Sequence, residues 1–366
     1  MKSLRRNEHM TSKERVMATF AHKEPDRVPI GYSANGNIDR RLCEALNVKE
    51  GEWVGEALGV DFRQVDAHYR GRKLHNDVKD RIVEGLWGIH MRWVEHPSGG
   101  YWDYCDFPLR DADIDTIAKW PMPDPDDFDY ASVVDACTRA APFAIHAGHP
   151  SMGDIINVTS MLRTMEQVLV DLITDDPAGL LLIDRRLDIM LETTKRTLEA
   201  GKGKIDFLWL GEDLGTQNSP LISLDLFRKH IRPRHQRFVD LAKFYGIPTI
   251  IHTCGSSSWA YEDFIEMGIN GVDTLQPEAT NMSPEYLKKT FGGRLFFHGC
   301  ISTAGPVAYG TPAEVTEYCR RTLDIMMPGG GYCFAPTHAL QDNSPTENVI
   351  AMYEAAHEYY GFGMDL

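Results

Sequence analysis

The sequence lacks an excess of positive charge. Its 53 acidic and 38 basic side chains give a formal net charge of −15 at pH 7. A protein that binds a polyphosphate chain or an anionic membrane needs a basic surface. We therefore expect neither nucleic acid nor a membrane as a partner, although a small anionic ligand in a local basic pocket stays compatible with this charge.

Long apolar runs and a regular set of cysteines are also missing. No stretch approaches the roughly eighteen uninterrupted apolar residues of a membrane span. The basic segment Met1–His9 is followed by none of the apolar residues of a secretory signal. The seven cysteines are odd in number and scattered, which favours reduced thiols available for metal binding or chemistry. We expect a cytoplasmic protein.

The sequence does contain a regular alternation of short apolar runs and amphipathic stretches. The stretches 224–245, 258–267, 283–290 and 312–326 are predicted as helices, and Thr311 is a suitable N-cap for the last. Eight strands joined by helices predict a parallel (β/α)₈ TIM barrel, an α/β fold that commonly occupies this length as one domain. The predicted strands are 28–32, 59–65, 143–147, 207–211, 248–252, 271–275, 294–299 and 332–335.

Two parts of the chain lie outside this alternation. Residues 1–25 are expected to form an N-terminal helical extension, and residues 69–130 are rich in Trp, His and Asp. We interpret 69–130 as an insertion after the second strand, with a short hairpin around 87–93, packed over one end of the barrel. Because no flexible linker brackets it, we expect residues 1–366 to form a single domain.

The active site of such a barrel is built at the carboxyl ends of its strands. His252 and Cys254 stand at one of these ends, and their H-x-C spacing in an extended segment places both side chains on one face. Alone this motif is weak, because both residues also pack well in cores. A third ligand from a neighbouring strand would give three protein ligands and an open position, the pattern of catalytic zinc.

Several residues compete for the third position. His338 and Cys300 follow other strands, whereas Cys333 lies within a strand and is more typical of a core thiol. Glu212 and Asp213 are candidates for an oxygen ligand or for orienting a ligated histidine, or else for helix capping or a salt bridge. His146 and His149 end the third predicted strand, where they either line the pocket or serve as structural histidines.

The chain resembles the uroporphyrinogen decarboxylase superfamily of (β/α)₈ barrels over almost its whole length. Singly each motif is weak, but together they are specific. The segments that carry the resemblance are Asp26–Pro29, Leu58–Asp61, Gly211–Gln217, Ser223–Phe227, Arg232–Pro233, Phe297–Cys300, Thr337–His338 and Ser344–Asn348.

The resemblance implies one of two activities. One branch decarboxylates a tetrapyrrole without a cofactor and grips substrate carboxylates with an Arg-Gln-Ala-Gly-Arg run after the first strand. Here the corresponding stretch, 32–37, reads Tyr-Ser-Ala-Asn-Gly-Asn and contains neither arginine. Without that bidentate clamp a poly-acid substrate is not favoured. A cofactor-free decarboxylase acting on a tetrapyrrole or another carboxylate stays as the alternative.

The other branch comprises zinc methyltransferases that move a methyl group between a corrinoid protein and a thiol. The resemblance implies that His252 and Cys254 bind Zn²⁺. The family usually supplies the third ligand as a cysteine after the last strand, and His338 occupies that place here.

The remaining implied roles follow from the same resemblance. Glu212 and Asp213 are predicted as catalytic residues that orient a ligand or accept a proton, and His146, His149 and Gln217 as cofactor-binding residues. The predicted partners are a corrinoid protein that supplies methylcobalamin and a small thiol or methylated substrate. A homodimer is left open.

Overall fold

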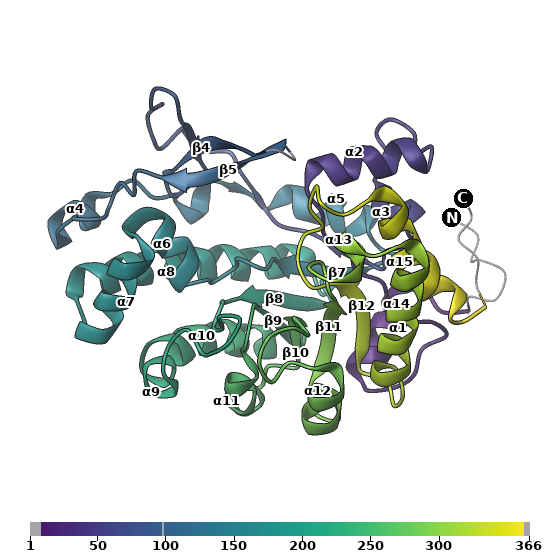
Figure 1. The fold of residues 1–366 in the computed structure, drawn as a ribbon. Helices are drawn as coiled ribbons and strands as arrows, with labels where there is room; N and C mark the ends of the chain where they lie inside the picture. The colour runs from purple at the N-terminus through teal and green to yellow at the C-terminus, as the bar shows by residue number, and fades with distance from the viewer. Residues whose placement is uncertain (1–8, 97–98, 362–366) are drawn as a thin grey trace.

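A curled sheet of seven parallel strands forms the centre of the protein (Figure 1). The computed structural model describes residues 9–96 and 99–361. Parallel sheets are buried on both faces, and the strands accordingly read as near-continuous apolar runs. In sheet order the strands are β1 (Phe62–Gln64), β7 (Ala144–Gly148), β8 (Phe207–Gly211), β9 (Thr249–Thr253), β10 (Gly271–Thr274), β11 (Phe296–Ile301) and β12 (Tyr332–Pro336).

The segment around Ile30 connects the two edges of this sheet. Ile30 forms a parallel bridge with Phe334 of β12, and its carbonyl accepts a hydrogen bond from the amide of Asp61, just before β1. The Ile30 amide bonds instead to the carboxylate of Asp61, at 2.8 Å. The first predicted strand, 28–32, is therefore reduced to a single bridge, because a side chain takes the place of a backbone partner.

Helices surround the sheet and cover its outer face (Figure 1). The predicted helix 312–326 has the same bounds in the structure, where Thr311 and Glu314 form a capping box. The helices are α1 (Ser12–Phe20), α2 (Gly36–Ala45), α3 (Val54–Ala57), α4 (Ile114–Lys119), α5 (Ala131–Arg139), α6 (Ile156–Arg163), α7 (Met165–Thr174), α8 (Pro177–Gly201), α9 (Leu224–Leu226), α10 (Arg232–Phe244), α11 (Tyr261–Met267), α12 (Pro284–Phe291), α13 (Pro306–Tyr309), α14 (Pro312–Met326) and α15 (Thr346–Glu358).

The predicted helix 224–245 is interrupted. A π-helical segment, Phe227–Ile231, separates α9 from α10. Pro233 lies in the first turn of α10 and has no amide hydrogen, so the regular hydrogen-bond ladder cannot pass through this point.

Between β1 and β7 the chain forms a separate set of small strands. The two ends of this excursion pair with each other, since β2 (His68–Tyr69) is antiparallel to β6 (Phe128–Asp129). Within it, β3 (Ile82–Glu84), β4 (Ile89–His96) and β5 (Gly99–Cys105) form an antiparallel sheet. Figure 1 places β4 and β5 above α6, and a small apolar cluster joins the excursion to α6 and α8 through Ile89, Leu109, Ile117, Val158, Leu162, Ala178 and Leu182.

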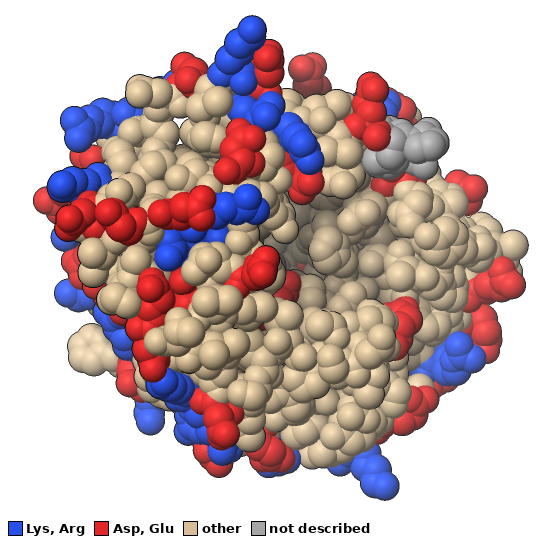
Figure 2. Space-filling view, turned by 60° about the vertical axis from the view of Figure 1, so that its left-hand side comes forward, with Lys and Arg blue, Asp and Glu red and all other residues tan. Residues whose placement is uncertain are grey.

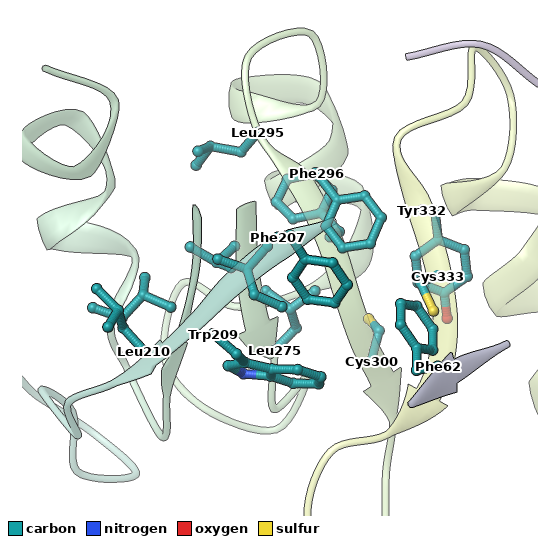
Figure 3. Close-up of a cluster of buried hydrophobic side chains, with 14 of the residues drawn as sticks. Phe62, Phe207, Trp209, Leu210, Leu275, Leu295, Phe296, Cys300, Tyr332 and Cys333 are labelled. Atoms are coloured by element: carbon teal, nitrogen blue, oxygen red, sulfur yellow. The ribbon is translucent and has the colours of Figure 1, made fainter. Parts of the chain in front are cut away.

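Aromatic and aliphatic side chains fill the inside of the curled sheet (Figure 3). Phe207 and Trp209 project from β8 toward Phe62, Phe296 and Tyr332 of other strands. The sheet therefore encloses a packed core, and open space for chemistry is restricted to its carboxyl end. Within the described part of the chain, no helix has the length and apolar character needed to cross a membrane.

Candidate active site

A cavity of about 640 Å³ opens at the carboxyl ends of the strands. Its lining includes residues of β7 to β12 and also Tyr104 from the excursion. His252, Cys254 and Asp213 lie together on its wall. This is the place where the barrel architecture predicts the active site.

Three polar side chains form a row across adjacent strands. Asp273 of β10 is in register with His252 of β9 on one side and with His298 of β11 on the other. Residues in register project to the same face of the sheet. One carboxylate oxygen of Asp273 lies 2.5 Å from Nδ1 of His252, and the other lies 2.5 Å from Nδ1 of His298. Asp273 thus fixes both imidazole rings and leaves their Nε2 atoms for other partners.

The sequence carries a signal for Asp273, a residue that the predicted site did not include. An aspartate within the short strand 271–274 stands out, because a buried carboxylate is costly unless it is paired. Its neighbour Thr274 has a φ of 90°, a rare conformation for a β-branched residue. The Thr274 hydroxyl lies 2.7 Å from Nδ1 of His252. Strained backbone conformations of this kind are found preferentially at functional sites.

Asp213, His252 and Cys254 offer one metal-binding atom each, and these atoms lie within 4.8 Å of one another. Sγ of Cys254 is 3.3 Å from Nε2 of His252, and Oδ1 of Asp213 is 3.7 Å from the same nitrogen. Asp213 is itself held in place, because it accepts hydrogen bonds from the Cys254 amide at 2.8 Å and from the Asn157 side chain at 2.7 Å.

The electrostatics of this group follow from its mutual contacts. Burial opposes the charged form of His252, but the hydrogen bonds to Asp273 and Cys254 outweigh it and hold the pKa of His252 well above its ordinary value. Burial likewise opposes ionisation of Asp273, yet His298 and His252 hold its pKa below the ordinary range. Burial raises the pKa of the Cys254 thiol, partly offset by His252.

The other proposed third ligands lie apart from this group. His338 is exposed at the mouth of the cavity, and its Nδ1 is 3.4 Å from the carbonyl of Ala339. Cys300 and Cys333 are fully buried among the rings of Phe62 and Tyr332 (Figure 3). The Cys333 thiol is directed to the carbonyl of Pro29, at 3.2 Å. These two sulfur atoms belong to the packed core, and neither lines the cavity.

The two residues predicted as catalytic separate in the structure. Asp213 faces the cavity, whereas Glu212 points to the amino end of α6 and accepts hydrogen bonds from the amides of Ile155 and Ile156. Nε2 of His235 lies 3.3 Å from the same carboxylate. A carboxylate at a helix amino terminus is favoured by the helix dipole. The fully buried Glu212 therefore has the helix-capping role that the sequence left open.

The predicted cofactor-binding residues are also divided. His146 lines the cavity and stacks on Phe207, and burial lowers its pKa to about 4. His149 accepts a hydrogen bond from the Ser151 amide, and burial lowers its pKa. Gln217 is exposed in the loop after β8, where its carbonyl accepts a hydrogen bond from Thr280. His146 is thus the member of this set that lines the cavity.

Comparison with known proteins adds a family to this geometry. The model of the uroporphyrinogen decarboxylase (URO-D) family matches residues 106–359. A methylcobamide:CoM methyltransferase MtbA of Methanosarcina acetivorans is 24% identical over 147 residues, which are 39% of this chain and 40% of that protein. The corresponding MtaA of Methanosarcina barkeri is 26% identical over 183 residues, 49% of this chain and 50% of that protein. The matched part therefore spans half or less of the length of these curated relatives.

A solved structure extends the likeness over nearly the whole chain. A methyltransferase from Methanosarcina mazei superposes with a TM-score of 0.65 at 18% identity, covering 96% of this chain and all of that one. At this identity the likeness establishes the fold alone. It agrees with the curled parallel sheet and the helical layer described above.

Proposed function

This chain belongs to the uroporphyrinogen decarboxylase family, closer to its methyltransferase members than to the decarboxylases, and we propose that it is a zinc-dependent methyltransferase. The methyl group would move between a corrinoid, supplied by a partner protein, and a thiol or small methylated substrate. The observation that carries the proposal is the group Asp213, His252 and Cys254 on the wall of the cavity.

The donor set suits zinc. Imidazole nitrogen, thiolate sulfur and carboxylate oxygen are its ordinary protein ligands, and three of them leave a position for a substrate. The Nδ1 atom of His252 is occupied by Asp273, so Nε2 is the nitrogen that would bind the metal. This carboxylate–histidine arrangement is the usual support of a ligated imidazole. We therefore propose Asp213, which the sequence analysis named as a candidate oxygen ligand, as the third ligand in place of His338.

Zinc, when bound, would stabilise the thiolate of a substrate at neutral pH. The tasks of the chain itself are to hold the ligands and to shape the cavity. Asp273 fixes the ring of His252, and Asn157 with the Cys254 amide fixes the carboxylate of Asp213. Tyr104 brings the excursion to the cavity wall, where it would help to shape the mouth for substrate or corrinoid.

The family's other activity receives less support from this cavity. Tyr32 and Ser33, from the stretch that carries two arginines in the decarboxylases, both line the wall. Neither supplies a cation for a substrate carboxylate. A cofactor-free decarboxylase is therefore the rival that the experiment below must separate.

Metal analysis tests the proposal. We expect one zinc per chain in protein purified without chelator, and loss of both zinc and methyl transfer in Cys254→Ser. The matched control is Cys43→Ser, which removes a partly exposed thiol of α2 outside the cavity and leaves zinc unchanged. Protein without stoichiometric zinc, together with full activity of His252→Ala, would contradict the proposal and favour the decarboxylase.

A further inference from the structure

The wall of the cavity lacks the side chains that bind anions most strongly. Within residues 9–96 and 99–361, its lining contains no lysine and no arginine. The space-filling view shows a deep hollow walled mainly by residues other than Lys and Arg (Figure 2). Among the lining histidines, burial lowers the pKa of His146 to about 4, so this ring is uncharged at neutral pH. A negatively charged ligand would lose its water here without gaining an opposite charge from a lysine or arginine, which is costly.

Asp154 adds to this wall a carboxylate that has no counter-ion. It lies in the loop between β7 and α6, lines the cavity and is only 4% exposed. Its Oδ1 accepts a hydrogen bond from the Val158 amide at 3.0 Å. In the described structure its Oδ2 has no hydrogen-bond partner, and no cationic side chain forms an ion pair with it. That oxygen is not fully buried, unlike the unpaired Nε2 of His298 in the same wall.

One buried guanidinium lies nearby but does not contact the Asp154 carboxylate. Arg186 of α8 donates to the Thr159 hydroxyl at 2.7 Å and to the backbone carbonyl of Asp154 at 3.4 Å. The carboxylate of Glu212 acts on the same guanidinium, so one cation faces two buried anions. Buried carboxylates in proteins are ordinarily paired, and Asp154 is the one of these two that is left for a ligand.

The charge of Asp154 is uncompensated for this reason. Burial and the charge of Glu212 raise its pKa well above the ordinary value, and Asp213 adds to this effect. The Val158 amide and Arg186 oppose it. A proton is one way to remove the uncompensated charge, and a bound cation is the other.

Aromatic rings make up much of the remaining wall. The faces of such rings attract organic cations, and cages of them are used to bind quaternary ammonium groups. Rings beside an unpaired carboxylate therefore favour an organic cation over a hydrated metal ion. The lining rings are those of Tyr32, Phe62, Tyr104 and Trp209, together with Trp53, whose ring already has the guanidinium of Arg63 over it at 4.5 Å.

We propose that the small-molecule substrate of this cavity is an organic cation, whose ammonium group pairs with Asp154. A ligand that ends in a sulfonate or carboxylate would be selected against. The inference rests on the proposed function only in naming the ligand as the substrate. The preference for positive charge comes from Asp154 and the wall around it, and it requires neither zinc nor a corrinoid.

Two ligands of the same shape test the preference for charge. Choline and 3,3-dimethyl-1-butanol differ in that a carbon atom replaces the ammonium nitrogen in the second. Their dissociation constants would be measured by calorimetry on the protein as purified. We expect choline to bind at least about ten-fold more tightly, because only choline supplies a charge opposite to that of Asp154. Equal affinity for the two ligands, or no detectable binding of choline, would overturn the inference.

Substitution of Asp154 locates the effect. Asp154→Asn keeps the size of the side chain and an acceptor for the Val158 amide, but removes the charge. Choline affinity should fall about ten-fold, whereas that of the alcohol should change less than about two-fold. The control is Asp184→Asn, which removes a partly exposed carboxylate of α8 outside the cavity and should change neither affinity. Unchanged choline affinity in Asp154→Asn, or an equal loss for both ligands, would overturn the ion pair.

Zinc content, measured on the same preparation, separates the two proposals. Binding is measured instead of turnover, so a protein that prefers choline but holds no zinc would overturn the proposed function and support the inference. A protein that holds zinc and shows no preference for choline would overturn the inference and leave the proposed function standing.

Discussion

Two buried aspartates, Asp61 and Asp273, each hold two nitrogen-bearing side chains, and the difference lies in the partners. Asp61 bonds to the guanidinium groups of Arg15 and Arg27 at 2.7 Å and also accepts the Ile30 amide. It lies before β1 and fixes the segment that joins the edges of the sheet. Asp273 lies within β10 and bonds to two imidazoles.

Asp61 is a structural carboxylate, whereas Asp273, in our proposal, orients a metal ligand. A guanidinium keeps its charge at every relevant pH, so Asp61 is locked into a permanent ion cluster. An imidazole can exchange its proton and has a second nitrogen. The second nitrogens of His252 and His298 belong to residues that line the cavity. We infer that Asp61, with its two arginines, stabilises the fold. Asp273, with its two histidines, holds side chains that still have a free nitrogen for a ligand.

The largest effect should come from breaking the structural cluster. Asp61→Asn takes a buried carboxylate away from Arg27 and Arg15, of which Arg15 keeps its contact with Asp26. We expect it to lower the free energy of unfolding by about 3–5 kcal/mol. Asp273→Asn should cost clearly less, because its imidazole partners can lose their protons. Urea unfolding of both variants checks the difference. Equal losses would contradict the distinction between the two aspartates.

For zinc affinity we expect the reverse order, with a larger loss in Asp273→Asn than in Asp61→Asn. Asp273→Asn removes the support of His252 and should weaken zinc binding by about 10- to 100-fold. Competition with a chromogenic chelator measures this affinity. The folded fraction of Asp61→Asn serves as the control, and its zinc affinity should match that of the unchanged protein. A wild-type affinity in Asp273→Asn would remove Asp273 from the account of the site.

Acid should destabilise the fold partly through Asp61. Burial opposes its ionisation, but Arg27 and Arg15 hold its pKa below the ordinary value of 3.8. The unfolded chain then binds the proton more tightly than the folded one. The stabilisation is present above about pH 4 and is lost as the pH falls through the lower folded pKa. The Asp61→Asn variant should show a shallower loss of stability with acid, and an unchanged pH slope would contradict this assignment.

The smallest effect is expected at the mouth of the cavity. His338→Ala removes an exposed side chain that lies apart from Asp213, His252 and Cys254. Zinc affinity should change less than about three-fold, within the scatter of a distant surface substitution. A loss as large as that of His252→Ala would restore His338 as a ligand.

The sequence predicted the strands well because their signal is local. Runs of apolar residues in the sequence mark the strands β7 to β12, and the family motifs indicate the order of these strands along the chain. The single bridge at Ile30 was not predictable in this way, since it depends on a carboxylate more than thirty positions away taking the backbone amide. The π-helical segment near Pro233 likewise reflects a local geometry that periodicity alone does not resolve.

The location of the candidate site was predictable, but the sequence left its third ligand open. The H-x-C spacing marks His252 and Cys254, which lie side by side in the structure. Asp213, Glu212 and His338 all follow a strand in the sequence, so their positions alone did not tell them apart. The direction of each side chain decides which of them faces the other ligands. Glu212 and Asp213 are neighbours in sequence, yet one caps α6 and the other faces the cavity.

X-ray absorption at the zinc edge tests the central claim most directly, because it counts sulfur ligands. Asp213, His252 and Cys254 predict zinc with a single sulfur at about 2.3 Å and nitrogen or oxygen in its remaining positions. The sulfur signal should disappear in Cys254→Ser and persist in Cys43→Ser. Two sulfur ligands in the substrate-free protein, or a sulfur signal that survives Cys254→Ser, would contradict the site described here.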